Sequence, residues 1–155
     1  MKRISLFVVA AIVFAFVLSC KKSGGGSNAG GGGTKPDTSK SVLVKITLNP
    51  LPNINTGIFN GAIDGLLPTL KEPTWKVNGT VRSGEGTIAF TPDDFQGGIL
   101  TLEATSNVNM AALTIGGGAS STYPYTVHIE PTINGKIKDS VTIKVTGAFS
   151  RQWSW

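Results

Sequence analysis

The sequence of 155 residues contains one cysteine, Cys20, and one histidine, His128. A single cysteine leaves no partner for an internal disulfide, and a tetrahedral zinc site needs more cysteine and histidine ligands than the chain offers. A G-x-S-x-G motif is also missing, and no orienting partner for His128 is evident that would make it a general base. We therefore expect a protein that is not an enzyme and needs no metal or cofactor.

The chain has no net charge outside its N-terminal region. The net charge is +5, but residues 41–155 carry eight basic and eight acidic side chains, so the excess lies in the first 40 residues. Nucleic-acid binding requires basic charge concentrated on a folded face. No nucleic-acid partner is expected.

Only the N-terminus has a long apolar run. Lys2-Arg3 precede the stretch from Ile4 to Leu18, which is shorter than the about 20 residues of a membrane-spanning helix. Val17-Leu18-Ser19-Cys20 follows at its end. A basic start, an apolar stretch and a small residue before a cut are typical of a cleaved signal. The segment resembles a bacterial lipoprotein signal with its lipobox, although leucine at position 18 is unusual; a signal anchor with an incidental cysteine is the alternative.

The resemblance implies that residues 1–19 are a signal peptide and that the Cys20 sulfur is lipidated with acyl chains of the palmitate type. Each buried methylene contributes about 0.8 kcal/mol, so several acyl chains hold a small domain on a membrane. Lys21, where aspartate would retain such proteins in the inner membrane, suggests the outer membrane, facing the periplasm or the cell surface. Residues 20–40 are then the lipidated cysteine and a tether rich in glycine and serine, whose composition cannot bury a core.

Residues 41–155 have the alternation of half-buried β-strands. Apolar and polar residues alternate in six segments, namely 42–48, 75–78, 87–90, 100–104, 125–130 and 141–146. Antiparallel sheets with one buried face give this pattern. Several such strands, separated by Gly, Pro and Asn, predict a single all-β domain over residues 41–155. We expect an antiparallel sandwich of about seven strands, with a small β-barrel as the alternative.

Asn134-Gly135 is a strong hairpin signal between two of these segments. A strict two-residue turn would pair His128 with Val141 and so oppose an outward and an inward residue. A shift by one residue pairs Ile129 with Val141 and lets inward residues meet. The sequence therefore predicts a three-residue connection or a bulge near Pro131, which cannot donate a ladder hydrogen bond.

Residues 74–147 contain several motifs that are informative about the fold, namely Gly86–Pro92, Gly98–Ala104, Tyr125–Val127, Asn134-Gly135 and Asp139–Val145. They resemble strands of bacterial immunoglobulin-like domains, and Trp75 is placed like the core tryptophan of strand C in that group. Leu100 stands where such domains usually have tyrosine. The resemblance implies an immunoglobulin-like sandwich, although Gly57–Ile63 is too rich in glycine to supply an obvious second strand.

The end of the sequence holds the candidate binding residues. If Phe149–Trp155 continues the preceding strand, Arg151, Trp153 and Trp155 share the face of Val141 and Ile143. These side chains either cap the core or form a platform for sugar rings or a protein partner. We name Arg151, Trp153 and Trp155 as candidate ligand-binding residues.

Two further segments are long connections whose strand topology the pattern does not decide. Residues 50–73 contain four prolines and apolar residues that we expect to pack on the sandwich. Ser106–Thr122 is either a binding loop or a short element folding back across the sandwich. Asp93-Asp94 is better explained as a turn than as a calcium site, because no D-x-D-x-D run supplies six oxygen ligands.

Together these features predict a lipid-anchored cell-envelope protein with a non-catalytic binding or adhesion module for a glycan or a protein partner. The alternative is a structural accessory subunit of an outer-membrane complex, bound through a sheet edge or the apolar residues 108–115.

Overall fold

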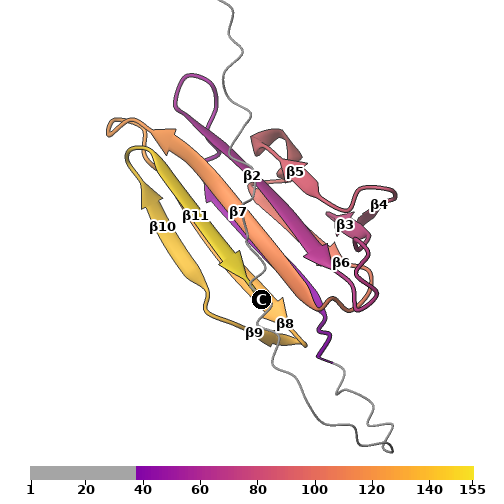
Figure 1. Ribbon diagram of the computed structural model, residues 1–155. Helices are drawn as coiled ribbons and strands as arrows, with labels where there is room; N and C mark the ends of the chain where they lie inside the picture. Colours follow the sequence, from indigo (N-terminus) through magenta and orange to yellow (C-terminus); the bar gives the residue numbers. More distant parts are fainter. Residues whose placement is uncertain (1–37) are drawn as a thin grey trace, which may run out of the picture. The chain divides into compact units, whose positions relative to one another are not determined.

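The computed structural model describes residues 38–155, which lie within one compact unit. Two antiparallel sheets pack face to face as a sandwich that does not close into a barrel (Figure 1). The first sheet has the order β10-β8-β1-β6-β3-β4, with β9 beside β8, and the second has the order β11-β7-β2-β5. Among the described residues, no helix is long and apolar enough to span a membrane.

The first sheet is built from seven strands: β1 (Val42–Asn49), β3 (Trp75–Val77), β4 (Thr80–Arg82), β6 (Ile99–Ala104), β8 (Tyr125–Ile133), β9 (Lys136–Ile137) and β10 (Val141–Val145). The second is built from four: β2 (Gly57–Leu66), β5 (Ile88–Phe90), β7 (Met110–Ala119) and β11 (Phe149–Ser154). Seven of the strands, β1, β2, β6, β7, β8, β10 and β11, have five residues or more, which matches the expected number.

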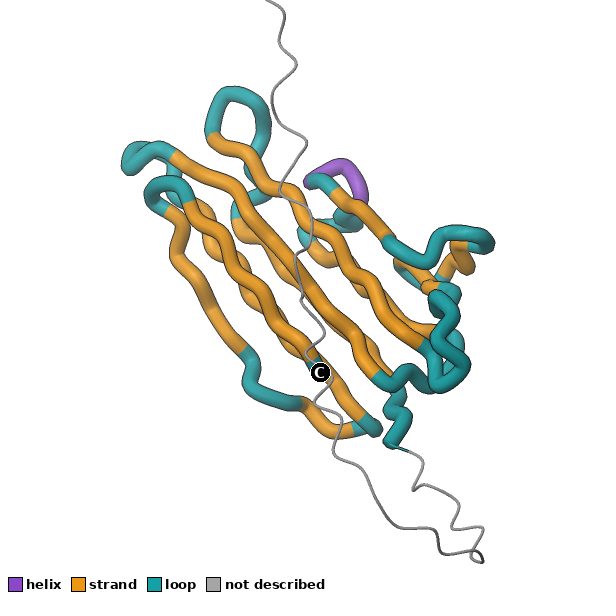
Figure 2. Tube along the Cα trace, in the orientation of Figure 1, coloured by secondary structure: helices purple, strands orange, loops and turns teal. Residues whose placement is uncertain are grey.

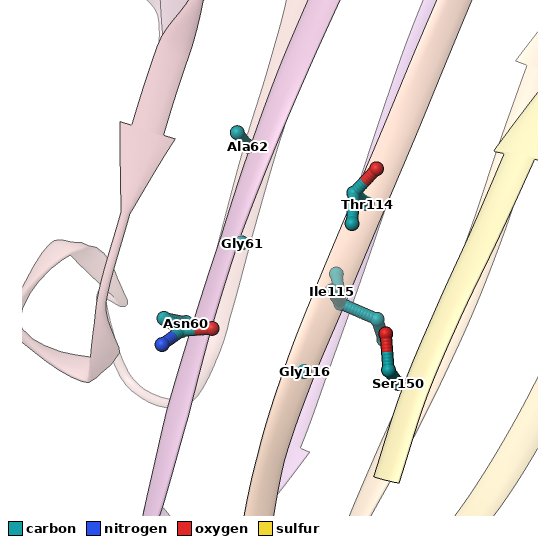
Figure 3. A pocket seen from close by; sticks show the side chains of 7 residues that line it. All are labelled: Asn60, Gly61, Ala62, Thr114, Ile115, Gly116 and Ser150. Atoms are coloured by element: carbon teal, nitrogen blue, oxygen red, sulfur yellow. The ribbon is translucent and has the colours of Figure 1, made fainter. Parts of the chain in front are cut away.

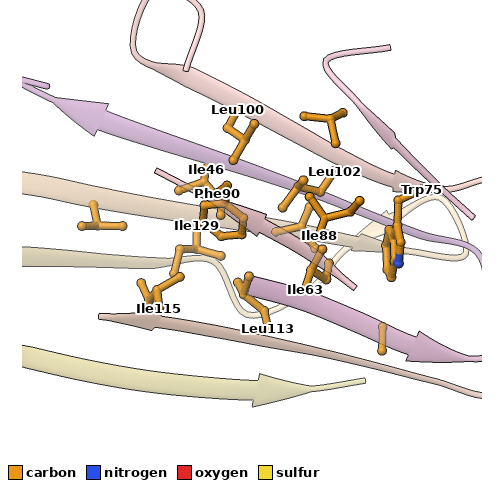
Figure 4. Packing of buried hydrophobic residues seen from close by; sticks show 14 of the residues in the cluster. Ile46, Ile63, Trp75, Ile88, Phe90, Leu100, Leu102, Leu113, Ile115 and Ile129 are labelled. Atoms are coloured by element: carbon orange, nitrogen blue, oxygen red, sulfur yellow. The ribbon is translucent and has the colours of Figure 1, made fainter. Parts of the chain in front are cut away.

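The core lies between the sheets and is apolar throughout. The inward faces predicted from alternation are confirmed for Ile46, Trp75 and Leu102, each with no exposed surface, and the same face of β8 is buried (Figure 4). No polar or charged side chain is buried in the described part of the chain. The indole Nε1 of Trp75 donates a hydrogen bond of 2.8 Å to the carbonyl of Gly86, so its one polar group is satisfied.

The bulge expected near Pro131 is confirmed. Asn134 and Gly135 form a two-residue turn with positive φ at both positions, and Ile133 pairs with Lys136. Beyond the turn Ile129 pairs with Val141, as predicted, because residues 138–140 hold one extra residue opposite the segment around Pro131. The backbone N–H of Lys138 donates to the carbonyl of Pro131 at 2.8 Å. The bulge restores the register that lets inward residues meet.

The glycine-rich segment from Gly57 is a central strand of ten residues, so the expectation of a poor strand there is wrong. Its inward glycines leave room for aromatic rings. A Cβ atom added to Gly57 would lie 3.3 Å from the Tyr125 ring, and one added to Gly65 would lie 3.3 Å from the Trp75 ring. A Cβ on Gly61 would overlap the ring of Phe90, its partner across the strand pair. Aromatic rings thus fill the core positions that β2 leaves empty.

The structure decides one open alternative and corrects one expectation. Most of Ser106–Thr122 is β7, the strand between β11 and β2, and not a binding loop. Phe149–Ser154 does not continue the face of β10, because the chain crosses at residues 146–148 and β11 joins the second sheet. The apolar face of β7 and the aromatic residues of β11 both need a covering sheet, and as members of the second sheet they pack against the first sheet.

The connections gather at two ends of the sandwich (Figure 2). One end holds the entry of the chain, where Lys40 pairs with Val108, and the last residue, Trp155, which pairs with Ala111. The other end holds the loops 50–56, 120–124 and 146–148, because β1, β7 and β10 all run towards it. We call the first the entry end and the second the loop end.

A substitution at Gly61 tests the glycine–aromatic packing. Gly61→Ala places a methyl group against Phe90 and the carbonyl of Thr114, and overpacking of this kind costs about 1–3 kcal/mol. We expect a lower urea midpoint with an unchanged m-value. Gly147→Ala is the matched control, because no atom lies within 4 Å of its added Cβ. Equal stability of the two variants would refute the explanation given for β2.

Candidate functional site

The loop end carries an ordered turn with an apolar tip. The N–H groups of Thr56 and Gly57 donate to the carbonyl of Asn53 at 2.9 and 2.8 Å, and Asn53 N–H donates to the Thr56 hydroxyl at 2.9 Å. These bonds hold the tip residue Ile54 in solvent with 94% of its surface exposed. An isolated exposed apolar residue needs no explanation, but a cluster of them indicates a contact surface.

A second loop completes the cluster from a distant part of the sequence. Tyr123, on the connection from β7 to β8, is 56% exposed, and Leu51 on the first loop is 39% exposed. Both line a hollow of about 330 Å³ together with Pro50, Pro52, Asn53, Thr56, Thr122, Pro124 and the edge of Tyr125. The hollow has no charged residue in its wall. It is suited to an uncharged, partly apolar ligand group.

The sequence analysis missed Leu51, Ile54 and Tyr123. A signal was present, since apolar residues within Pro50–Asn55 interrupt a loop of prolines and asparagines. The signal was incomplete because Tyr123 lies about 70 residues away and only the fold brings the two loops together.

The predicted binding residues Arg151, Trp153 and Trp155 lie along the second sheet towards the entry end. Trp153 and Trp155 are half-buried and pack against the core, whereas Arg151 is exposed. The Arg151 guanidinium donates a hydrogen bond of 3.0 Å to the carbonyl of Ser150. The structure therefore brings these three side chains together on one edge of the sheet but not with the loop-end hollow.

The outer face of the second sheet bears another hollow, also of about 330 Å³ (Figure 3). Small or uncharged residues line it, namely Asn60, Gly61, Ala62, Thr114, Ile115, Gly116 and Ser150. It is open and offers few groups that would orient a ligand. We assign it no role.

Titratable groups do not converge on a reactive centre in residues 38–155. His128 Nδ1 lies 2.8 Å from the Thr142 hydroxyl on the outer face of the first sheet. A carboxylate oxygen of Asp94 accepts a hydrogen bond of 2.8 Å from the Thr91 N–H and so caps the turn at Pro92–Asp94. Burial, and then the charge of Glu72, raise the pKa of Asp64. No group of three or more His, Cys, Asp or Glu residues gathers in this part of the chain.

Comparison with known proteins shows the fold. No protein-family model matches the chain, and no curated protein matches its sequence. Solved structures do match: a DUF4425 domain of unknown function from Bacteroides vulgatus has a TM-score of 0.58 and 6% identity, covering 76% of this chain and 94% of that one. A DUF4425 family protein from Bacteroides ovatus has a TM-score of 0.57, 8% identity and the same coverage.

A third neighbour is a Parabacteroides distasonis protein solved by NMR in its calcium-bound form, with a TM-score of 0.53 and 14% identity over 85% of this chain and 99% of that one. The structural neighbours of this chain thus include Bacteroides DUF4425 family proteins with a β-rich fold. At these identities the likeness concerns the fold alone.

The titration of Tyr125 tests the packing beneath the loop-end hollow. Its hydroxyl donates a hydrogen bond of 2.7 Å to the carbonyl of Ile58. Burial raises its pKa to about 12, partly offset by a backbone hydrogen bond at Gly118. The unfolded value is about 10, so Tyr125 contributes its full stability below pH 10 and loses it as the pH rises towards 12.

The variant Tyr123→Phe leaves Tyr125 as the only tyrosine. When this variant is titrated to high pH, we expect its tyrosinate absorbance near 295 nm to rise with a midpoint well above pH 10. The urea-unfolded variant serves as the control and should titrate near 10. A folded-state midpoint near 10 would contradict the described burial.

Proposed function

We propose that this chain is a lipid-anchored cell-envelope protein whose sandwich binds a glycan or protein partner without catalysis, through its loop end. The anchor rests on the Lys2-Arg3, apolar stretch and Cys20 pattern, which lies outside the described residues. Lys21 favours the outer membrane. The resemblance of residues 74–147 to bacterial immunoglobulin-like domains stays a sequence-based inference and is consistent with a binding module.

One observation carries the proposal, which is the position of the exposed apolar cluster. Leu51 and Tyr123 line the loop-end hollow and Ile54 is exposed on the same loop as Leu51, whereas residues 38–40 enter the sandwich at the opposite end. A chain anchored through the residues before Lys40 would be held by its entry end. The loop end is then the part of the domain most accessible to a partner outside the anchoring membrane.

The walls of the hollow agree with a binding role. Tyr123 offers an exposed ring, and tyrosine is common at recognition surfaces because it combines apolar area with a polar tip. Asn53 and Thr56 supply hydrogen-bonding groups beside it. Our proposal includes no calcium site, although one structural neighbour was solved in its calcium-bound form, because the described residues of this chain bring no carboxylate cluster together.

A structural accessory subunit of an outer-membrane complex is the second candidate. The observation that favours it is the free edge of β11, which carries Arg151 and Trp153.

The anchor is tested in the source cells. Cys20→Ser should abolish labelling of the chain with palmitate and leave the chain uncut, with its apolar signal still attached. An inhibitor of signal peptidase II should cause the wild-type chain to accumulate with its signal attached. Ser23→Ala, in the segment after the cysteine, is the matched control and should behave as wild type. A Cys20→Ser chain that is cut and labelled with palmitate as wild type would refute lipid anchoring.

The loop end is tested on an array of purified glycans and peptidoglycan fragments. Tyr123→Ala and Ile54→Ser should each weaken binding at least tenfold, because both remove exposed side chains at the loop end, without changing the free energy of unfolding by more than about 0.5 kcal/mol. Ile137→Ser is the matched control, since Ile137 is 61% exposed but lies away from the loop end. Equal losses in all three variants would refute a loop-end site. A wild-type protein that binds no glycan would refute the glycan ligand.

A further inference from the structure

β11 has a free edge along which another strand can pair. It pairs with β7 on one side and with no strand on the other in residues 38–155. Trp155 and Ala111 exchange two backbone hydrogen bonds of 2.9 and 3.0 Å. Antiparallel ladders alternate, so the backbone groups of Arg151 and Trp153 also point to β7. Those of Ser150, Gln152 and Ser154 point to the free edge.

This edge lacks the features that usually prevent strand addition. Proteins protect edge strands by shortness, charge, proline or bulges. The outer strands β4 and β5 have three residues each, and β10 carries Lys144 and follows the bulge at residues 138–140. β11 has six residues in continuous register with β7, no proline, and Arg151 as its one charged residue.

β10 forms a ledge beside the same edge. The first sheet is six strands across, while the second is four, and Figure 1 shows β10 beyond β11 on this side of the sandwich. Val141 and Ile143 are on the inward face of β10, opposite Ile129 and Val127, yet both are only half-buried. A strand added to β11 would lie over β10 and remove more of their apolar surface from water.

We propose that the β11 edge and the β10 ledge bind one extended segment of another polypeptide by strand addition. Its inward residues opposite Phe149 and Trp153 are apolar, where they meet half-buried aromatic rings. Its residue opposite Arg151 is acidic, because the exposed guanidinium has only the Ser150 carbonyl as a hydrogen-bonding partner among the described residues. Backbone hydrogen bonds supply affinity in this mode, and the alternate side chains supply specificity.

A single strand fits this edge better than a second copy of the sandwich. Two copies paired through β11 would be related by a two-fold axis normal to the sheet, which keeps both first sheets in one layer. Because β10 extends beyond β11, the two β10 strands and their bulges would then compete for one space. A lone strand brings no second ledge with it.

The test uses the mature full-length chain in detergent and the peptide Thr-Val-Thr-Glu-Thr-Val-Thr, which reads the same in both directions. Binding should slow amide hydrogen exchange at Ser150, Gln152 and Ser154 and leave exchange on the outer strand β10 unchanged. A control peptide is N-methylated at the third and fifth residues, which face the edge and lose their donors. It should bind at least tenfold more weakly.

Two variants separate strand addition from a purely structural role of β11. Gln152→Pro removes the central N–H group of the free edge but no N–H group that points to β7. The variant should therefore fold but bind the peptide at least tenfold more weakly. Arg151→Glu should reverse the charge preference and favour a peptide with lysine in place of glutamate by about fivefold. Equal binding of the methylated peptide, or no reversal with Arg151→Glu, would overturn the proposal. So would edge amides that are already protected in a dimer of the free protein.

Discussion

The packing of the sandwich depends on the glycines of β2, because the space left by their missing side chains is filled by aromatic rings of neighbouring strands. Two of these rings come from the other sheet, since Tyr125 lies over Gly57 and Trp75 lies over Gly65. Phe90 fills the place of the missing side chain of Gly61 from the adjacent strand. Protein interiors are close-packed, so a ring of this size needs a neighbour without a side chain. The glycines are therefore the reason that three large rings fit between the sheets with almost no exposed surface.

This packing of rings against glycines also explains which strands could not be predicted from the alternation of apolar and polar residues. Strands such as β1 and β8 were predictable because each inward position carries its own apolar side chain. The register around Pro131 was predictable for the same reason, since a one-residue slip would expose every inward residue of β10. β2 was not predictable, because only Phe59 and Ile63 bring their own side chains to the core, while side chains of other strands occupy the space at its inward glycines. β7 has the same difficulty near Gly116–Gly118, where a Cβ on Gly117 would meet the Tyr125 hydroxyl at 2.7 Å.

The candidate surfaces were predictable only in part, for a related reason. Arg151 and Trp153 were named as candidates from residue type alone, but their sheet was not predicted, because the crossover at residues 146–148 leaves no periodic signal. The loop-end hollow joins Leu51 to Tyr123, and that proximity depends on β2 and β7 being adjacent strands. Once β2 is recognised as a strand, the loops before β2 and after β7 must lie at the same end. The failure to find the hollow thus follows from the failure to find the strand.

The direction of β1 links the proposed anchor to the two proposed surfaces. β1 begins just after Lys40, which pairs with Val108 at the entry end, and carries the chain to the loop end within eight residues, about 27 Å at 3.4 Å per residue. A ligand at the loop end would therefore be bound roughly one strand length from the point where a tether attaches. The free edge of β11 runs along the side of the sandwich instead, between the two ends. A strand there would not cover Ile54 or Tyr123, because those residues are on loops beyond the end of the sheet. The two proposed surfaces are therefore separate, so that occupancy of one by a ligand would not require release of a ligand from the other.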